Sequence, residues 1–462
     1  MLESGLCLWE ECSMSEQLLD LAERAVKMAE KLGADQAEAY IGKSSAFVID
    51  VENSAIKSAE EQRDAGIGIR TIIDKKIGFA YVTTLYEDDI KEVVSMSVDL
   101  AKASIADPDF VSLPSDDSAY PEVNGLYDKA IKEMSSDAAA DYVIRVIDAS
   151  KQVLEGREFA IEGGIQTSCG TSAIANSLGV SKTSSKTSIT LYSLPIVKEG
   201  EDQTTSYEYQ VSRKLSDIDP EWVGETAAHL TLNTLGPKTI EGGEMPVVFG
   251  PLGAASVLGR GFADAISAEE VQKGRSYISD AFGDKIASDI VTITDNALLD
   301  FGIGSRSYDS EGHPTQVTPI IEDGILKSLL HNSYTANKDD VPNTGNASRP
   351  SYSGLPSIST TNFILSPGKG TLDDLVSEID RGVICNRTGD RPNMTTGDLS
   401  AMLLEGFYIE KGEIKHPLKN TLVGINMRDL LQRISRVGED TRTSFSMVTP
   451  SFVIESATVT SG

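Results

Sequence analysis

Apolar residues recur three or four positions apart in several segments of the first half of the chain. This spacing predicts amphipathic helices over residues 15–32, 88–104 and 137–154. Between them, alternating or continuous apolar runs predict β-strands, and the segment IIDKKIGFAYV predicts a hairpin that turns at Asp74–Lys76. The predicted strands cover residues 37–41, 47–51, 66–73 and 78–84, and a longer β-rich region follows at 157–213.

A further helix is predicted after this region by its end signals. Asp219 is suited to the N-cap, Pro220 to the first helical position and Gly236 to the C-terminal end. The order strand, turn, strand, helix therefore occurs at 47–104 and again at 165–236, which indicates an internal duplication.

Residues 1–14 lack a periodic apolar pattern, and the first convincing helix cap is Ser15. We therefore expect residues 1–14 to form a disordered extension that the fold does not need.

The second half of the chain begins with a predicted strand at 245–249, followed by Gly250, Pro251 and a helix. Beyond this helix the pattern is β-rich, with short helices predicted over 371–379, where Thr371 and Asp374 match a capping box, and over 427–434. The whole pattern predicts an α+β fold. Residues 15–240 are predicted to form an N-terminal α/β domain of helices on small sheets. Residues 241–462 are predicted to form a β-rich C-terminal domain with a central helix.

The composition restricts the partners and the compartment. The chain has 70 acidic and 41 basic residues and a formal net charge of −29, which argues against direct binding of nucleic acid. No apolar run approaches the roughly 18 residues that span a bilayer, and the N-terminus does not resemble a signal peptide. The cysteines match neither a disulfide framework nor a CxxC site, so we expect a reduced, cytoplasmic protein; they are Cys7, Cys12, Cys169 and Cys385.

The few histidines do not predict a metal site on one helix. Such a zinc site needs two ligands about one turn apart, and no two histidines are that close, so we expect each of them to be structural; they are His229, His313, His331 and His416. Cys385 has no neighbouring histidine and is expected to be a buried thiol. We identify no nucleophile elbow, P-loop or dinucleotide-binding fingerprint and expect no cofactor.

The helix after Pro251 has two faces. Its helical spacing predicts an apolar stripe of Leu252, Ala255, Gly259, Phe262 and Ile266. Ser256, Arg260, Asp264 and Ser267 line another face, where Arg260 and Asp264 are four positions apart and are expected to pair.

From Val257 onward the chain resembles the TldD/PmbA family of peptidase subunits. The resemblance covers roughly residues 240–460, and the N-terminal half matches in general layout, including SAIKSAEEQRDAGIGIR. The matching segments, which are specific in combination, are AEEVQKGRSYISDAFGDKIAS, YDSEGHPTQVTPIIEDGILKSLLHNSYTA, NTGNASRP, MTTGDLSAMLLEGFYIEKGEI and NTLVGINMRDLLQRISRVGED.

The resemblance also indicates a branch of the family. In the TldD branch a helix carries HExxxH, whose histidines hold zinc and whose glutamate acts as base, and a C-terminal cysteine adds a ligand. Counted back from the GRS at 274–276, these helix positions fall on Gly259, Arg260 and Asp264, and the tail RVGEDTRTSFSMVTPSFVIES has no cysteine. The chain therefore resembles the PmbA (TldE) branch, which lacks the metal motif and has the older label modulator of DNA gyrase.

This resemblance implies a non-catalytic subunit of a cytoplasmic zinc metallopeptidase complex that acts on unfolded or short peptides. Its partner would be a TldD-type subunit with HExxxH, or a second copy of this chain, and the helix would be kept because it packs the core. Two alternatives stay open. One is a stand-alone homodimeric peptide-binding or scaffold protein, and the other is an active hydrolase with a metal site built from acids and distant histidines.

Overall fold

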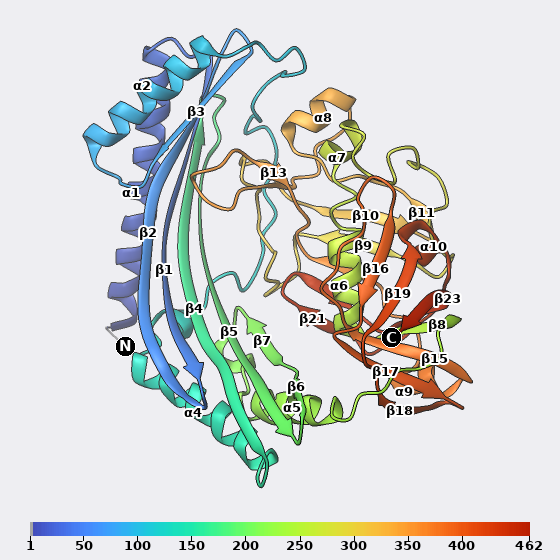
Figure 1. Cartoon of the computed structure of the whole chain (residues 1–462). Coiled ribbons are helices and arrows are strands. Elements are labelled where there is room, and N and C mark those ends of the chain that lie inside the picture. The colour runs from blue at the N-terminus through green and yellow to red at the C-terminus, as the bar shows by residue number, and fades with distance from the viewer. Residues whose placement is uncertain (1–2) are drawn as a thin grey trace.

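The protein consists of two layered halves that lie side by side (Figure 1). The structure is a computed structural model that describes residues 3–462, with side chains from residue 15 onward. It confirms the α+β class: helices cover one side of the N-terminal sheet, and the β-rich C-terminal half lies against the other side (Figure 1). None of the described helices is long and apolar enough to cross a lipid bilayer.

The N-terminal half contains one sheet of seven strands in the order β3-β2-β1-β4-β5-β6, with β7 also paired to β5. The small sheets that the sequence predicts are joined because β1 and β4 pair along their length, from Glu38 opposite Asn176 to Val51 opposite Gly163. The strands are β1 (Gln36–Glu52), β2 (Ala55–Ile73), β3 (Lys76–Val82), β4 (Glu158–Asn176), β5 (Ser181–Glu199), β6 (Asp202–Thr205) and β7 (Glu208–Ser212). The helices are α1 (Glu3–Lys31), α2 (Glu87–Ala103), α3 (Lys129–Lys132), α4 (Ser136–Val153) and α5 (Pro220–Asn233), and a short 3-10 helix, η1, covers Leu215–Asp217.

Helix α1 begins at Glu3, whereas the sequence predicts its first cap at Ser15 and a disordered extension before it. No proline follows Glu3 within α1, so nothing in the sequence forces the helix to stop before Ser15. Residues 1–2 lie outside the described residues.

The N-terminal half repeats one order of elements. A helix, two long strands, shorter strands and a second helix occur as α1-β1-β2-β3-α2 and again as α4-β4-β5-β6-β7-α5. This topological repeat is consistent with the duplication that the sequence indicates.

The two faces of this sheet differ in polarity because successive side chains along a strand point to opposite sides. Odd-numbered apolar residues face the helices: Ile41 and Ile69 belong to the cluster with α1 and α2, and Ile165 and Leu191 to the cluster with α4. Even-numbered positions face the C-terminal half. One of them, Gly68, lies so close to it that a Cβ atom would be 2.0 Å from the carbonyl oxygen of Tyr352.

Several local signals in the sequence are confirmed. The hairpin turns at Asp74 and Lys75, with φ angles of 49° and 63°, and Ile73 pairs with Lys76. The Asp219 side chain accepts a hydrogen bond from the Trp222 amide at the start of α5. Thr371 and Asp374 form the predicted capping box at the start of α9 (Leu372–Ser377).

The C-terminal half contains a six-stranded sheet, an eight-stranded sheet and a two-stranded ribbon. The six-stranded sheet consists of β9 (Ile293–Asn296), β10 (Val317–Glu322), β11 (Ile325–Leu326), β14 (Phe363–Leu365), β21 (Arg442–Ser444) and β22 (Met447–Thr449). The larger sheet consists of β8 (Gly243–Phe249), β15 (Arg381–Arg387), β16 (Asp398–Met402), β17 (Glu405–Glu410), β18 (Glu413–Pro417), β19 (Thr421–Asn426), β20 (Ile434–Val437) and β23 (Phe452–Ser461). The ribbon is β12 (Ala347–Ser348) and β13 (Ser357–Ile358), and the helices are α6 (Pro251–Gly261), α7 (Ala268–Gln272), α8 (Ser333–Asp339), α9 and α10 (Met427–Gln432).

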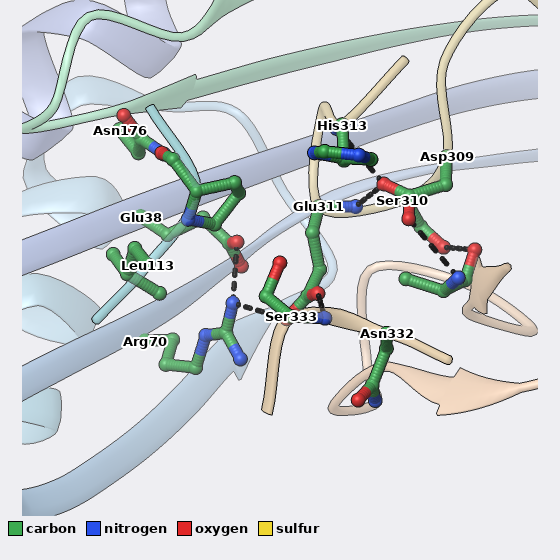
Figure 2. A network of polar contacts seen from close by, with 12 residues as sticks. Glu38, Arg70, Leu113, Asn176, Asp309, Ser310, Glu311, His313, Asn332 and Ser333 are labelled. Carbon is green, nitrogen blue, oxygen red and sulfur yellow. Dashed lines mark hydrogen bonds and ion pairs between the residues drawn. The ribbon is translucent and has the colours of Figure 1, made fainter. Parts of the chain in front are cut away.

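Buried ion pairs join the two halves (Figure 2). Arg70 of β2 donates to Glu38 of β1 at 2.7 Å and to Glu311 of the C-terminal half at 3.0 Å. Arg349, also from the C-terminal half, donates to the other oxygen of Glu38. Glu38 therefore accepts hydrogen bonds from one arginine of each half.

The same network fixes the segment around Glu311 (Figure 2). Glu311 accepts a hydrogen bond from the Ser333 amide at 2.9 Å, and Asp309 accepts hydrogen bonds from the amides of Glu311 and His313. Burial raises the pKa of Glu311, but Arg70 and the Ser333 amide outweigh it and hold that pKa below its ordinary value. Burial and the charge of Glu311 raise the pKa of Asp309.

Candidate functional site

Helix α6, on which the sequence resemblance places the metal-motif positions, lies between the two large sheets of the C-terminal half (Figure 1). Pro251 at its first position follows Gly250, in the arrangement that favours a helix start. Gly253 allows the helix to approach strand β15, because a Cβ atom there would lie 2.0 Å from the carbonyl oxygen of Cys385. The face toward the core is Ala254, Val257, Leu258 and Gly261.

This buried face differs from the predicted stripe. Ala255, Phe262 and Ile266 are buried, but Leu252 and Gly259 are only partly buried. Leu252 and Gly259 both lie within α6, and the helix instead turns Ala254, Val257 and Leu258 toward the core.

The predicted pair of Arg260 and Asp264 is wrong. Arg260 is exposed, and its Nη1 donates to the carbonyl oxygen of Gly389 at 3.0 Å. Asp264 lies beyond the end of α6, and its Oδ2 is 3.8 Å from Nη1 of Arg391. Pairing four residues apart requires both residues to be helical, and Asp264 is not.

The residues at the aligned metal positions do not fit zinc. Gly259 has no side chain, Arg260 is a cation, and Asp264, whose pKa is raised by burial against the opposing effect of Arg391, is the one potential ligand. Among the described residues, no group of three or more His, Cys, Asp and Glu side chains is arranged to hold a metal ion.

None of the four histidines lies on α6, whereas Cys385 lies on β15, the strand that packs against this helix. His229 is exposed on α5, and His416 stacks on Tyr408 with 5.4 Å between ring centroids. His313 and His331 are more buried, and burial lowers the pKa of both. Burial also raises the pKa of the Cys385 thiol, which disfavours the thiolate that a nucleophile needs.

We expect that placing histidines at Gly259 and Asp264, with glutamate at Arg260, does not create a peptidase. The two histidines would not share a helix, and a third ligand would still be missing. A histidine at 259 must also displace Met447, whose Cε atom lies 3.4 Å from the position of a Cβ, so we expect a loss of about 1–3 kcal/mol in the free energy of unfolding.

The measurements are zinc content, cleavage of an unfolded reporter peptide and urea denaturation, with Arg260→Glu alone as the control. Chelator-sensitive turnover by the triple variant would show that the site needs only these three side chains.

A groove with a volume of about 400 Å³ lies next to the strands that pack on α6. Strand β7 of the N-terminal half forms one wall with Tyr209, Gln210 and Val211. Strands β21 and β22 contribute Arg442, Thr443 and Val448, and Trp222 and Phe301 add aromatic surface. No local sequence pattern predicts this groove, because its walls come from segments more than 200 residues apart.

An ion pair between Arg442 and Glu208 holds the two walls of the groove together. Arg442 donates to Glu208 of β7, with 2.8 Å between Nη1 and Oε2, and stacks at 5.8 Å from the Tyr209 ring. Nearby, Arg387 donates to Glu405 at 3.1 Å and lies 3.8 Å from the ring centroid of Tyr207. Arg442 therefore joins the N-terminal sheet to the six-stranded sheet, and Arg387 joins Tyr207 to the eight-stranded sheet.

The strands beside the groove lie at sheet edges. In the described part of the chain, β21 is the last strand of the six-stranded sheet, and β7 pairs only with β5. A free strand edge with neighbouring side-chain pockets is one of the recurring ways to bind an extended peptide. The backbone of Tyr209 is already engaged by Arg442 and Glu208, so a peptide backbone can pair with the rest of β7 or with β21 and place its side chains against the aromatic rings.

The comparisons with known proteins agree with this fold. The family models PmbA/TldA metallopeptidase domain 1, central domain and C-terminal domain match residues 37–101, 129–235 and 242–461. These boundaries separate the two repeated units of the N-terminal half and the C-terminal half. The fold and the matches define a metallopeptidase-type architecture.

The chain belongs to the PmbA/TldD family. It is 30% identical to the metalloprotease TldD homolog of Buchnera aphidicola over 84% of this chain and 82% of that protein. It is 28% identical to the metalloprotease PmbA of Escherichia coli O157:H7 over 93% of this chain and 94% of that protein. The crystal structure of TldE from Thermococcus kodakarensis superposes with a TM-score of 0.88 at 25% identity, over 95% of this chain and 99% of that chain.

Proposed function

We propose that this chain is the non-catalytic, PmbA/TldE-type subunit of a cytoplasmic zinc metallopeptidase complex that acts on unfolded or short peptides. The observation that carries this proposal is that α6 is packed in the core but lacks metal ligands. The helix keeps its packed place in the core, while Gly259 and Arg260 provide no metal ligand and Asp264 pairs with Arg391. A helix retained without its chemistry suits a subunit that shapes a shared site and leaves the metal to its partner.

The groove beside β7 and β21 supports a peptide as the substrate. Aromatic rings and the guanidinium group of Arg442 lie next to strands at sheet edges, and an extended peptide can pair with such an edge only when it is unfolded. Under this proposal the chain holds the peptide, and the partner that carries HExxxH performs the hydrolysis.

The proposal is tested by purifying this chain together with the HExxxH-bearing family member of the same organism. We expect a complex of the two, cleavage of unfolded peptides by the mixture, and neither cleavage nor stoichiometric zinc in this chain alone. The control is the partner with its motif glutamate replaced by glutamine, which should assemble but not cleave. One tightly bound zinc per chain, together with chelator-sensitive cleavage by this chain alone, would contradict the proposal and favour an active hydrolase.

A stand-alone homodimeric peptide-binding protein is the second candidate, because the whole groove lies within one chain. Peptide binding can be measured directly, since Trp222 lines the groove and the chain has two tryptophans, Trp9 and Trp222. In a Trp9→Phe variant we expect the fluorescence of Trp222 to change on addition of an unfolded peptide. A dimer by light scattering that binds peptide and does not associate with the HExxxH protein would favour this candidate.

A further inference from the structure

A second cavity, with a volume of about 170 Å³, lies where the inner face of the N-terminal sheet meets the segment 306–310. It adjoins the buried ion pairs of Figure 2, since Asp309 and Ser310 are part of its wall. A water molecule occupies about 30 Å³ of liquid volume, so the cavity can hold a small polyatomic group. Its position lies apart from the groove beside β7 and β21 and from α6.

Two guanidinium groups on its wall have buried donors without an acceptor. The Arg349 side chain is 0% exposed; Nη2 donates to Glu38 and Nε to the carbonyl oxygen of Ser310, but Nη1 has no partner among the described residues. Arg306 has two such atoms, Nε and Nη2. A buried donor left without an acceptor destabilises the fold, and a charged donor does so more strongly. Two arginines from different segments therefore direct buried, unpaired N–H donors at one cavity, which indicates that a hydrogen-bond acceptor binds there.

One cation on the cavity wall also lacks a carboxylate partner in the described part of the chain. Lys186 of β5 donates to a carbonyl oxygen, that of Ser305 at 3.2 Å, rather than to a carboxylate. The carboxylate on the cavity wall, Asp309, has its oxygens engaged by backbone amides, those of Glu311 and His313 on Oδ1 and that of Ala347 on Oδ2. Burial, Arg306 and Arg213 lower the pKa of Lys186 to about 7, as expected for a cation held without an anion.

We propose that this cavity binds a small oxyanion, of the phosphate or carboxylate class, between Lys186, Arg306 and Arg349. Guanidinium groups match the oxygens of phosphate and carboxylate, and an ammonium group adds a point charge. The hydroxyl groups of Ser172 and Ser184 on the same wall provide further donors. The bound anion would accept hydrogen bonds from the unpaired donors of Arg306 and Arg349 and would give Lys186 a counter-charge. It would also tie the inner face of the sheet to the C-terminal half.

The test is isothermal titration calorimetry of the full chain with inorganic phosphate and, separately, with acetate, at constant ionic strength. The variant is Lys186→Met, which keeps an aliphatic side chain and removes the cation. The matched control is Lys182→Met, because Lys182 is on the same face of the same strand but pairs with Asp116 outside the cavity. We expect one anion per chain in the wild type, about tenfold or greater weakening in Lys186→Met, and unchanged affinity in Lys182→Met.

A second measurement does not depend on any variant. Phosphate or acetate should raise the Tm of the wild type above the value in sodium chloride of equal ionic strength, because the ligand binds the folded state. Tighter binding of phosphate would identify a free phosphate-type ligand, and tighter binding of acetate a carboxylate such as a peptide terminus. No saturable heat and no specific rise in Tm with either anion would overturn the proposal, as would equal weakening in both variants. None of these results depends on the peptidase partner, so they are separate from the test of the proposed function.

Discussion

Replacing Glu38 by alanine should lower the free energy of unfolding by about 3–5 kcal/mol. Glu38 is 1% exposed and accepts hydrogen bonds from Arg70 and Arg349, one from each half of the protein. Its removal leaves Arg349 without a carboxylate partner and Arg70 with Glu311 alone. Most of this loss comes from the buried cation that is left without a counter-charge. Removing one partner of a buried ion pair is far more destabilising than replacing both partners by apolar residues.

The control for this experiment is Glu61→Ala on the same sheet. Glu61 also pairs with an arginine, Arg63, at 2.7 Å, but both side chains are more than half exposed, so the loss should be about 0–1 kcal/mol. Urea denaturation of both variants measures the difference, and the slope of the transition shows whether the two halves still unfold together. If Glu38→Ala loses no more stability than Glu61→Ala, the buried pairs do not hold the halves together.

The elements that were predicted well depend on neighbours along the chain. The turn at Asp74 and Lys75, the cap at Asp219 and the capping box of Thr371 and Asp374 are each formed within a few residues. The length of the strands was not predicted. The polar stretch between 41 and 47 divides β1 into two predicted strands, and the charged residues 55–65 of β2 carry no strand pattern. Both segments are strands because they pair with partners elsewhere in the chain: β1 lies between β2 and β4 along its length.

At the candidate site, too, features set by neighbouring residues were predicted and contacts between distant residues were not. The resemblance located the three motif positions, and the structure places them at and beyond the end of α6. The expected pair of Arg260 and Asp264 failed because it assumed that the helix continues past Gly259 and Gly261, two residues that disfavour helix. The pairs that do form at the domain junction, such as Arg70 with Glu311, join residues 241 positions apart. No periodic pattern in a single sequence encodes such a separation.

Gly253→Ala should destabilise the protein by about 1–3 kcal/mol or more, although alanine is the better helix former. The added Cβ would lie 2.0 Å from the carbonyl oxygen of Cys385, so either α6 or the backbone of β15 must move. The contact is with backbone in the centre of a sheet, where no side chain can rotate away. Glycine at this position weakens the helix, but it allows α6 to pack closely on β15.

Gly259→Ala is the matched variant, since it makes the same chemical change in the same helix. Its Cβ would be 3.4 Å from the flexible side chain of Met447, and alanine gains up to about 1 kcal/mol of helix propensity, so we expect unchanged or higher stability. The midpoints of urea denaturation compare the two variants directly. If α6 is retained as a scaffold that shapes a site shared with a partner, Gly253→Ala should also weaken assembly with the HExxxH protein, whereas Gly259→Ala should not. Equal stability of the two variants would show that the backbone of β15 moves to accommodate the added Cβ atom. Close packing of α6 on β15 would then not explain why the chain keeps this helix without metal ligands.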